Sequence, residues 1–387
     1  MPFLEHVFAM PVIPEAQRAH GQKQPGSKRS GATRAGSLPA LPGCFANHST
    51  SQSDVVRAYI QSTLNTKVPT WVELPAELVP EEFKGVKRPC VRLYKSLYGH
   101  PEAGWHWDQK FKQVMSELGA THCADTFQST YYMKDSGLLL TLYVDDMILS
   151  GPSKAHASFW QKIQKFIEIE EPTPVSRVLG RHHNMVEDEH GKRMHFDMSD
   201  FAKNVCASYE HLSGCTLKPA NTRFLSEGSL VTSDYKVKGA MASDASKVLM
   251  KIIWSARLSR PDLMKGISHL TRKITTWSRA DDRKLFRLMC YLKGTTNYVL
   301  EGYIRDKPEA LKLNLYTDAD RASGVEDVKS TSGMFLTLEG PQSFWPLCWG
   351  SKRQGATARS TCEAEIVSLD SGLLGKDFQC RIFLRQS

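Results

Sequence analysis

The sequence predicts an α+β protein: an antiparallel sheet with flanking helices, then a helical segment, then a smaller α/β region. Strand and helix patterns alternate first, two long amphipathic helices follow, and strand patterns return from Leu311. The 387 residues correspond to roughly two or three domains. We therefore expect four segments, with bounds at residues 1–53, 54–230, 231–305 and 306–387.

The first segment is predicted to be a disordered, low-complexity arm. No acidic residue occurs from Ala16 to Ser53, where Gly, Ser, Pro, Gln and basic residues dominate. Such a composition buries too little apolar surface to offset the entropy lost on ordering. Folded sequence should therefore begin near Asp54.

The second segment should contain the main sheet. A short strand is predicted from Asp54 into a helix near Gln61, and apolar residues at helical spacing predict a helix over 102–118. Three strands should follow, at 127–133, 138–144 and 147–149, the first two joined by the turn at 134–137. A helix beginning at Ser153 should then bury four apolar residues, Phe159, Ile163, Phe166 and Ile167.

The remaining elements are predicted from periodicity and helix caps. Weak signals favour short strands and a helix near 201–209, and stronger ones favour helices at 245–274, interrupted near Pro261, and at 278–293. The second long helix opens with the capping pattern Ser278-x-x-Asp281. Strands are expected at 311–317, 333–338 and 344–350, followed by a helix that begins with Ser360-x-x-Glu363.

Charge and cysteine content limit the class of protein. The net charge is +9, and the window from Lys251 to Tyr316 holds 14 basic against 6 acidic residues. Such a surplus favours binding to a phosphate backbone or, equally, a solvated helix face. Nine unpaired-looking cysteines, no secretory signal and no long apolar run predict an intracellular, cytoplasmic or nuclear protein without a membrane span.

Two adjacent carboxylates lie between apolar strand runs in the segment LLLTLYVDDMILSG. Asp145 and Asp146 are costly at this position unless the turn is exposed or a cation neutralises them. Carboxylates on rigid strands can hold Mg²⁺ against a phosphate. An Asp-Asp pair in a tight turn is more often only a turn, so the pair alone does not decide between these readings.

The wider sequence extends the argument, because Tyr143-Val144-Asp145-Asp146 resembles the YxDD box of reverse transcriptases. The surrounding blocks resemble the Pol polyprotein of copia-type LTR retrotransposons over residues 54 to about 370. In chain order they are Asp54–Ile60 (DVVRAYI), Leu93–Gly99 (LYKSLYG), Ser259–Asp262 (SRPD), Tyr291–Thr295 (YLKGT), Tyr316–Asp320 (YTDAD), Ser330–Gly333 (STSG), Trp349–Gln354 (WGSKRQ) and Ser360–Glu365 (STCEAE).

This resemblance implies an RNA-directed DNA polymerase with a reverse-transcriptase palm and a helical thumb and connection. Asp54 and Asp145 would be the principal ligands of Mg²⁺ or Mn²⁺, with Asp146 beside them. The nucleotide-binding residues would be Tyr59, Tyr98, Gly99 and Glu102. The implied partners are an RNA template, a DNA primer, the RNA–DNA hybrid, dNTPs and other segments of the same polyprotein.

The resemblance also implies a partial RNase H-like α/β domain after residue 305. Asp318 and Glu365 match its first two carboxylates and would be catalytic metal ligands, whereas Glu363 is better explained as a helix cap. The basic helices would grip nucleic-acid phosphates without reading sequence. The residues expected to do so are Arg272, Lys273, Arg283, Lys284, Arg287 and Lys293.

The sequence departs from the family pattern in three places. The family's LKQ triplet is His100-Pro101-Glu102 here, no counterpart of the fingers precedes Asp54, and the chain ends before the third and fourth RNase H carboxylates. We therefore expect no RNase H activity from this chain alone. The alternative function is a catalytically inactive nucleic-acid-binding remnant of such a polyprotein.

An aspartic protease is a further alternative, because two Asp-Ser-Gly triplets occur, at 135–137 and 370–372. The first triplet has the composition of a hairpin turn, and the second lies in a helical pattern. Both placements disfavour the protease.

Overall fold

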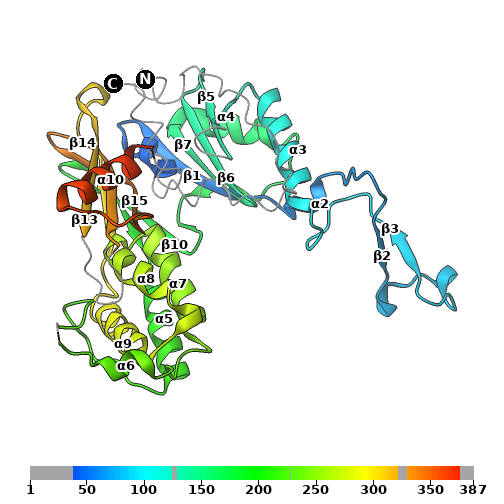
Figure 1. The fold of residues 1–387 in the computed structure, drawn as a ribbon. Helices are drawn as coiled ribbons and strands as arrows, with labels where there is room; N and C mark the ends of the chain where they lie inside the picture. The colour runs from blue at the N-terminus through cyan, green and yellow to red at the C-terminus, as the bar shows by residue number, and fades with distance from the viewer. Residues whose placement is uncertain (1–37, 124–128, 227, 321–328, 375–387) are drawn as a thin grey trace. The chain divides into compact units, whose positions relative to one another are not determined.

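The structure, a computed structural model, describes residues 38–123, 129–226, 228–320 and 329–374. Most of the predicted arm, residues 1–37, and the chain end, residues 375–387, lie outside the described residues. The chain mixes helices and sheets and divides into two compact units (Figure 1). We call residues 50–174 the N-terminal unit, and the described residues of 38–49 and 175–374 the C-terminal unit.

The N-terminal unit is built on a six-stranded sheet with the strand order β4-β5-β6-β7-β1-β8. Its apolar face packs against two helices, α3 (Ala103–Glu117) and α4 (Ser153–Ile163), around Phe111 and Trp160. A short helix, α2 (Ala58–Gln61), follows β1. The strands are β1 (His48–Asp54), β4 (Thr121–His122), β5 (Thr130–Met133), β6 (Leu138–Tyr143), β7 (Asp146–Pro152) and β8 (Thr173–Pro174).

Strand β1 corrects the prediction that folded sequence begins near Asp54. Its sequence, HSTSQSD, contains no apolar residue, so it gives no hydrophobic signal. Hydrogen bonds satisfy its buried hydroxyls instead: Ser150 Oγ donates to Thr50 Oγ1 at 3.1 Å, and Ser53 Oγ donates to the Glu170 carbonyl at 2.7 Å. A polar strand can thus lie inside a sheet when its neighbours supply the partners.

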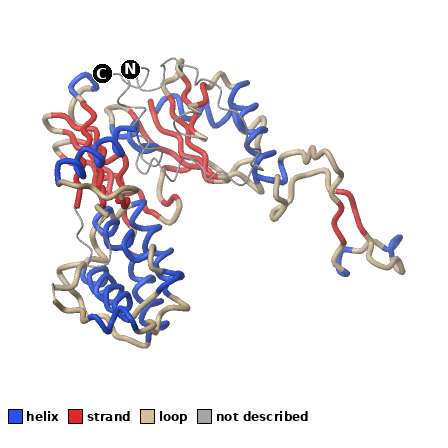
Figure 2. The backbone as a smooth tube through the Cα atoms, viewed as in Figure 1, coloured by secondary structure: helices blue, strands red, loops and turns tan. Residues whose placement is uncertain are grey.

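A separate two-stranded ribbon belongs to the N-terminal unit (Figure 2). Strand β2 (Trp71–Glu73) pairs antiparallel with β3 (Cys90–Arg92), and the register places Trp71 opposite Arg92. Two short 3-10 turns, η3 (Ala76–Leu78) and η4 (Glu81–Phe83), lie between the strands. The ribbon lies near the start of the predicted segment 54–230 and was not among the predicted elements.

The C-terminal unit contains a seven-stranded sheet with the order β13-β14-β15-β12-β11-β10-β9. Residues 175–230, which we had assigned to the first domain, contribute β9 to β11 to this sheet, so the compact units divide at 174/175 rather than at 230. Pairing between β11 and β12 joins segments about a hundred residues apart, a contact that periodicity cannot predict. The strands are β9 (Arg177–Val178), β10 (Arg181–Asp188), β11 (Gly191–Asp197), β12 (Leu300–Tyr303), β13 (Lys312–Asp320), β14 (Thr331–Gly340) and β15 (Ser343–Arg353).

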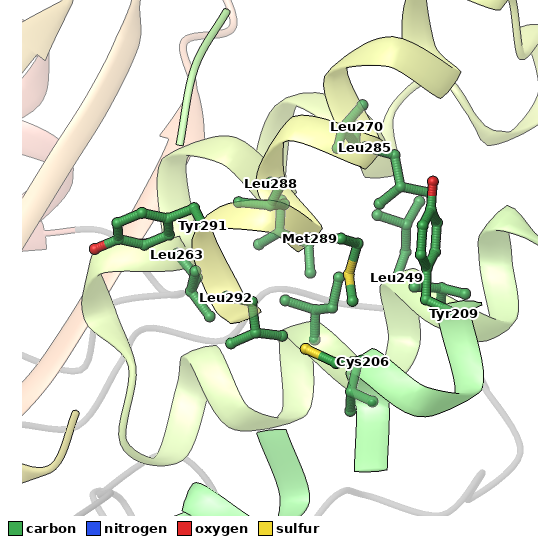
Figure 3. Packing of buried hydrophobic residues seen from close by; sticks show 14 of the residues in the cluster. Cys206, Tyr209, Leu249, Leu263, Leu270, Leu285, Leu288, Met289, Tyr291 and Leu292 are labelled. Carbon is green, nitrogen blue, oxygen red and sulfur yellow. The ribbon is translucent and has the colours of Figure 1, made fainter. Parts of the chain in front are cut away.

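A helical core packs within the same unit. Figure 3 shows Leu249, Leu285 and Leu288 meeting around Met289, all fully buried. The predicted capping box is present: the Ser278 backbone N–H and hydroxyl both donate to Asp281 at the start of α9. The helices are α5 (Ser199–Ser213), α6 (Thr232–Lys236), α7 (Ala245–Leu258), α8 (Met264–Thr271), α9 (Arg279–Gly294) and α10 (Thr361–Leu374), with short turns η2 (Leu38–Cys44), η5 (Pro261–Leu263), η6 (Ile274–Thr276) and η7 (Pro308–Ala310).

Two of the sequence blocks, SRPD and YLKGT, meet in this core. Arg260 is buried and donates to both carboxylate oxygens of Asp262, at 2.9 and 2.8 Å, and to the carbonyl and hydroxyl oxygens of Thr295, at 2.8 and 2.7 Å. Tyr291 Oη donates to the same carboxylate at 2.9 Å. These bonds tie the α7–α8 junction to the end of α9.

The predicted helices and strands are largely confirmed, with one clear error in burial. Phe166 is 41% exposed, although Phe159, Ile163 and Ile167 are buried as expected. Helix α4 ends at Ile163, so helical spacing no longer applies at Phe166. Within the described ranges, no helix combines the length and apolar character needed to cross a bilayer.

Candidate active site

Three carboxylates meet at one end of the N-terminal sheet. Asp54 is the last residue of β1, and Asp145 and Asp146 lie at the turn between β6 and β7, the strand next to β1. The Val55 backbone N–H donates to the Asp145 carbonyl at 2.8 Å, which fixes the two chain segments side by side. Asp54 and Asp145, which are 91 positions apart in the sequence, are thus brought together.

The turn that presents the two aspartates is tight and unusual. Tyr143 pairs directly with Asp146, so only Val144 and Asp145 form the connection. Val144 has a φ of 60°, a left-handed conformation that costs a β-branched residue about 1–2 kcal/mol. The indole N–H of Trp107 donates to the Val144 carbonyl at 2.7 Å and holds this conformation from helix α3.

The carboxylates perturb one another. Burial, then the charges of Asp54 and Asp145, and then a hydrogen bond to Asp54 raise the pKa of Asp146 to about 6. The pKa of Asp54 is raised by burial and by the charges of Glu170 and Asp145, while its hydrogen bond with Asp146 opposes the rise. The two carboxyl groups are therefore coupled in their titration, and a nearby cation would favour their ionised forms.

An aromatic pair lies next to these carboxylates. The rings of Tyr59 and Tyr98 are 4.7 Å apart between centroids. Burial, followed by the charges of Tyr98, Asp145 and Tyr143, raises the pKa of the Tyr59 hydroxyl.

The two other predicted nucleotide-binding residues lie in the same loop and helix start. Gly99 has a φ of +94°, which glycine adopts without strain. Glu102 is the N-cap residue of α3, and its carboxylate lies 3.7 Å from the buried His106 ring. Tyr98, Gly99 and Glu102 therefore lie on one chain segment, and the Tyr98 ring contacts Tyr59.

The donor chemistry suits a hard divalent cation, since three carboxylates supply oxygen ligands only. Among the described residues, however, no group of three or more histidine, cysteine, aspartate or glutamate side chains is arranged to hold a metal ion. Asp54 and Asp146 are instead hydrogen-bonded to each other.

The carboxylates of the C-terminal unit are arranged differently. Asp318 is an exposed residue of β13, and Glu365 lies half-buried in the first turns of α10. Their neighbours Ala319 and Ala364 share a small buried cluster, and Ser368 Oγ of α10 donates to the Asp318 carbonyl at 2.8 Å.

Strand alternation separates the two side chains. Ala319 faces α10, so Asp318 points to the opposite face of the sheet. There its strand neighbour Asp320 forms an ion pair with Lys265 of α8. In the described chain no hydrogen bond or ion pair joins Asp318 to Glu365.

Most of the basic residues expected to bind nucleic acid are engaged within the fold. Arg283 donates to Asp234 at 2.9 Å beside Arg279, which contacts the same carboxylate at 2.7 Å. Lys293 lies 3.6 Å from Glu210.

The others also have contacts within the C-terminal unit. Arg287 donates to the Thr222 carbonyl at 2.9 Å, and Lys284 lies near His269 and over the Tyr235 ring. Arg272 lies 3.4 Å from His269, and the Lys273 backbone N–H donates to the Leu270 carbonyl at 3.0 Å. These contacts give the basic residues a structural role besides any role in binding.

Two residues near the carboxylates were missed by the sequence analysis as parts of the site. Glu170 pairs through its backbone N–H with the Asp54 carbonyl at 2.8 Å, and its charge acts on Asp54. Trp107 was not predicted to belong to the site, although its indole N–H supports the turn. Neither role has a local sequence signal, because each depends on a contact across the fold.

The two Asp-Ser-Gly triplets lie where the sequence predicted. Residues 135–137 form the turn between β5 and β6, and residues 370–372 lie in α10.

Comparison with known proteins agrees with this geometry. Residues 43–218 match the family described as "Reverse transcriptase (RNA-dependent DNA polymerase)". The chain is 25% identical over 332 residues to the Retrovirus-related Pol polyprotein from transposon TNT 1-94 of Nicotiana tabacum, covering 82% of this chain and 23% of that protein. It is 24% identical over 330 residues to the Pol polyprotein from transposon RE1 of Arabidopsis thaliana, covering 82% and 20%.

A solved structure, the foamy viral protease-reverse transcriptase in complex with RNA/DNA hybrid, is similar with a TM-score of 0.48 and 12% identity, covering 90% of this chain and 40% of that one.

The matched residues include β1, the β6–β7 turn and the three carboxylates, so residues 43–218 are a region of the reverse transcriptase class. More particularly, the chain resembles the Pol polyproteins of copia-type retrotransposons, as its sequence blocks predicted. It spans about a fifth of the length of these curated relatives, 23% and 20% of the two named here.

Proposed function

We propose that this chain is the nucleotidyl-transfer segment of a retrotransposon polyprotein and copies RNA into DNA. The observation that carries the proposal is the meeting of Asp54, Asp145 and Asp146 at adjoining strand ends. Their place in the matched reverse transcriptase region supports it. In this proposal the N-terminal sheet is the palm, the helices α5 to α9 are the thumb and connection, and β12 to β15 with α10 form a partial RNase H-like domain.

The three carboxylates would hold Mg²⁺ or Mn²⁺ ions. When bound, two such ions can activate a primer 3′-hydroxyl and stabilise the charge of the leaving pyrophosphate. The protein's part is to present the carboxylates on rigid strands. When ionised, Asp54 and Asp146 would be two anionic ligands side by side, whose charges a bound cation would stabilise.

The aromatic pair would form the floor of the nucleotide site. Tyr59 packs on Tyr98 within reach of the Asp145 field, so a sugar lying on Tyr59 would place its phosphates toward the carboxylates. Glu102 is less suited to a triphosphate than the family's glutamine, because a carboxylate repels the phosphate charges. We therefore expect a high KM for dNTPs.

Primer extension on an RNA template with Mg²⁺ tests the proposal. The Asp145→Asn variant should lose at least a hundredfold in incorporation, because a neutral amide is a poor ligand for the cation. Asp135→Asn is the matched control: it makes the same change in an exposed turn at the other end of β6.

Equal extension by the wild type and the Asp145→Asn variant would contradict the proposal. Absence of extension by the wild-type chain, with hybrid binding retained, would instead support the inactive remnant.

A further inference from the structure

The β2–β3 ribbon carries an exposed row of aromatic and cationic side chains. Trp71 is 61% exposed and Tyr94 is 66% exposed, both large apolar surfaces in contact with solvent. The pairing register places Trp71 directly opposite Arg92 on one face, and strand alternation brings Tyr94 to the same face. The Arg92 guanidinium lies over the Tyr94 ring, 5.1 Å from its centroid.

The charges around this row are predominantly positive. Glu73, the acidic residue of β2, is neutralised by Arg88, which donates to it at 3.0 and 2.8 Å. Lys67, Lys87 and Lys95 are exposed and have no ion pair among the described residues. The same holds for Glu77 and Glu82 in the connection between the two strands. With Arg92, four unpaired cations face two unpaired carboxylates, so the ribbon combines flat aromatic surfaces with a small surplus of positive charge.

The row is continuous with the connection that leads to the candidate active site. Beyond the ribbon, the Leu64 backbone N–H donates to the Tyr94 carbonyl at 3.0 Å, and Ser96 donates to the Ser62 carbonyl at 3.0 Å. The second pair adjoins α2, which carries Tyr59. Two backbone hydrogen bonds thus connect the exposed row to the segment that carries Tyr59 within the N-terminal unit.

We propose that Trp71, Arg92 and Tyr94 form a binding site for single-stranded nucleic acid. Unpaired bases stack on aromatic side chains whatever their sequence, and nearby cations hold the backbone phosphates. A two-stranded ribbon with both faces open to solvent is only marginally stable by itself, so stacking on this face would also stabilise the ribbon. The inference deepens the proposed function, on which it rests, by naming where an unpaired strand contacts the chain.

The alternative occupant of such a face is another protein surface. The charge pattern favours the polyanion, because the unpaired cations of the ribbon outnumber its unpaired carboxylates by two. Protein interfaces are commonly depleted of lysine.

Fluorescence anisotropy with labelled 12-residue oligonucleotides, oligo(dT) and oligo(rU), tests the site on the full chain. The double variant Trp71→Ala/Tyr94→Ala should bind about 5- to 100-fold more weakly, which corresponds to one stacked base or more. Phe83→Ala, which removes an exposed aromatic from the same ribbon outside the row, is the matched control and should bind as the wild type does. Arg92→Ala should reduce the salt dependence of affinity by a slope of about 0.7.

The outcomes separate this inference from the proposed function. Unchanged affinity of the double variant, or an equal loss in the Phe83→Ala control, would overturn the site. Self-association of the wild type that the double variant abolishes, with oligonucleotide affinity unchanged, would assign the face to protein contact and also overturn it. Asp145→Asn should bind oligonucleotides normally, so a failure of primer extension alone leaves the single-strand site standing. Comparison of oligo(dT) with oligo(rU) shows whether the site distinguishes DNA from RNA.

Discussion

Replacement of Asp262 by alanine should strongly destabilise the C-terminal unit. Only 4% of the Arg260 side chain is exposed, so loss of its carboxylate partner leaves a buried charge with the Thr295 oxygens alone. Breaking a buried ion pair from one side costs about 3–5 kcal/mol. Tyr291 Oη loses its acceptor in the same variant.

The reverse substitution should cost less. In Arg260→Met the remaining carboxylate of Asp262 is 24% exposed, so water can solvate it, and we expect a loss of about 2–3 kcal/mol. The double variant should cost less than the sum of the two, by about 1.5–3 kcal/mol, because it leaves no unpaired charge.

Urea unfolding followed by tryptophan fluorescence measures these differences. Asp200→Ala is the control, since it removes an exposed ion pair with Lys203, at 3.3 Å, from helix α5 of the same unit. It should change the free energy of unfolding by less than about 1 kcal/mol. A cost below 1 kcal/mol for Asp262→Ala, or strict additivity in the double variant, would refute the reasoning from burial.

Three further predictions concern other parts of the fold. The folded pKa of Asp146 is about 6, above its unfolded value. Its contribution to the free energy of unfolding is therefore complete at low pH and is lost as pH rises from about 4 through 6. The Asp146→Asn variant still donates to Asp54, so its urea midpoint should decline less over this pH range. Gly151→Ala should cost about 2–3 kcal/mol, because φ is +144° and the new Cβ would lie 2.7 Å from a carbonyl oxygen of the β5–β6 turn; an unchanged midpoint would contradict this. Arg287→Ala should lower the free energy of unfolding by about 1 kcal/mol, because it loses its hydrogen bonds to Thr222. The salt slope of duplex binding should stay unchanged, whereas a slope shallower by about one would show a phosphate contact instead.

The sequence predicted elements whose cause is local. The capping box of α9 and the turn between β5 and β6 depend on residues within a few positions of each other, so the pattern contains the whole cause. Strand β1 could not be found in this way, because its stability comes from partners such as Ser150 and Glu170, roughly a hundred residues distant. The boundary at 174/175 was missed for the same reason, since β11 pairs with β12 far along the chain.

The candidate site was predicted in part. Asp145 and Asp146 are visible because charged residues interrupt an apolar run, and the resemblance joined them to Asp54. The coupled titration of Asp54 and Asp146 and the influence of Glu170 are not visible, since they depend on distances that no spacing in the sequence specifies.

The net charge of a sequence window can misplace a binding surface, because it leaves out ion pairs with residues outside the window. The segment from Lys251 to Tyr316 has a surplus of basic residues when only its own acidic residues are counted. In the folded unit three carboxylates from outside that window, Asp234, Glu210 and Asp320, pair with its cations. The relevant quantity for phosphate binding is the charge left after such pairing.

The charge left after ion pairing makes the β2–β3 ribbon the better candidate for contacting a nucleic-acid strand, although its net charge in the sequence is modest. The carboxylates of Glu73 and Glu81 are already paired, and among the described residues the four remaining cations of the ribbon outnumber Glu77 and Glu82 by two. A cation that the fold has already used contributes little counterion release. Salt-dependent binding should therefore be more sensitive to substitutions in the ribbon than to substitutions along α9.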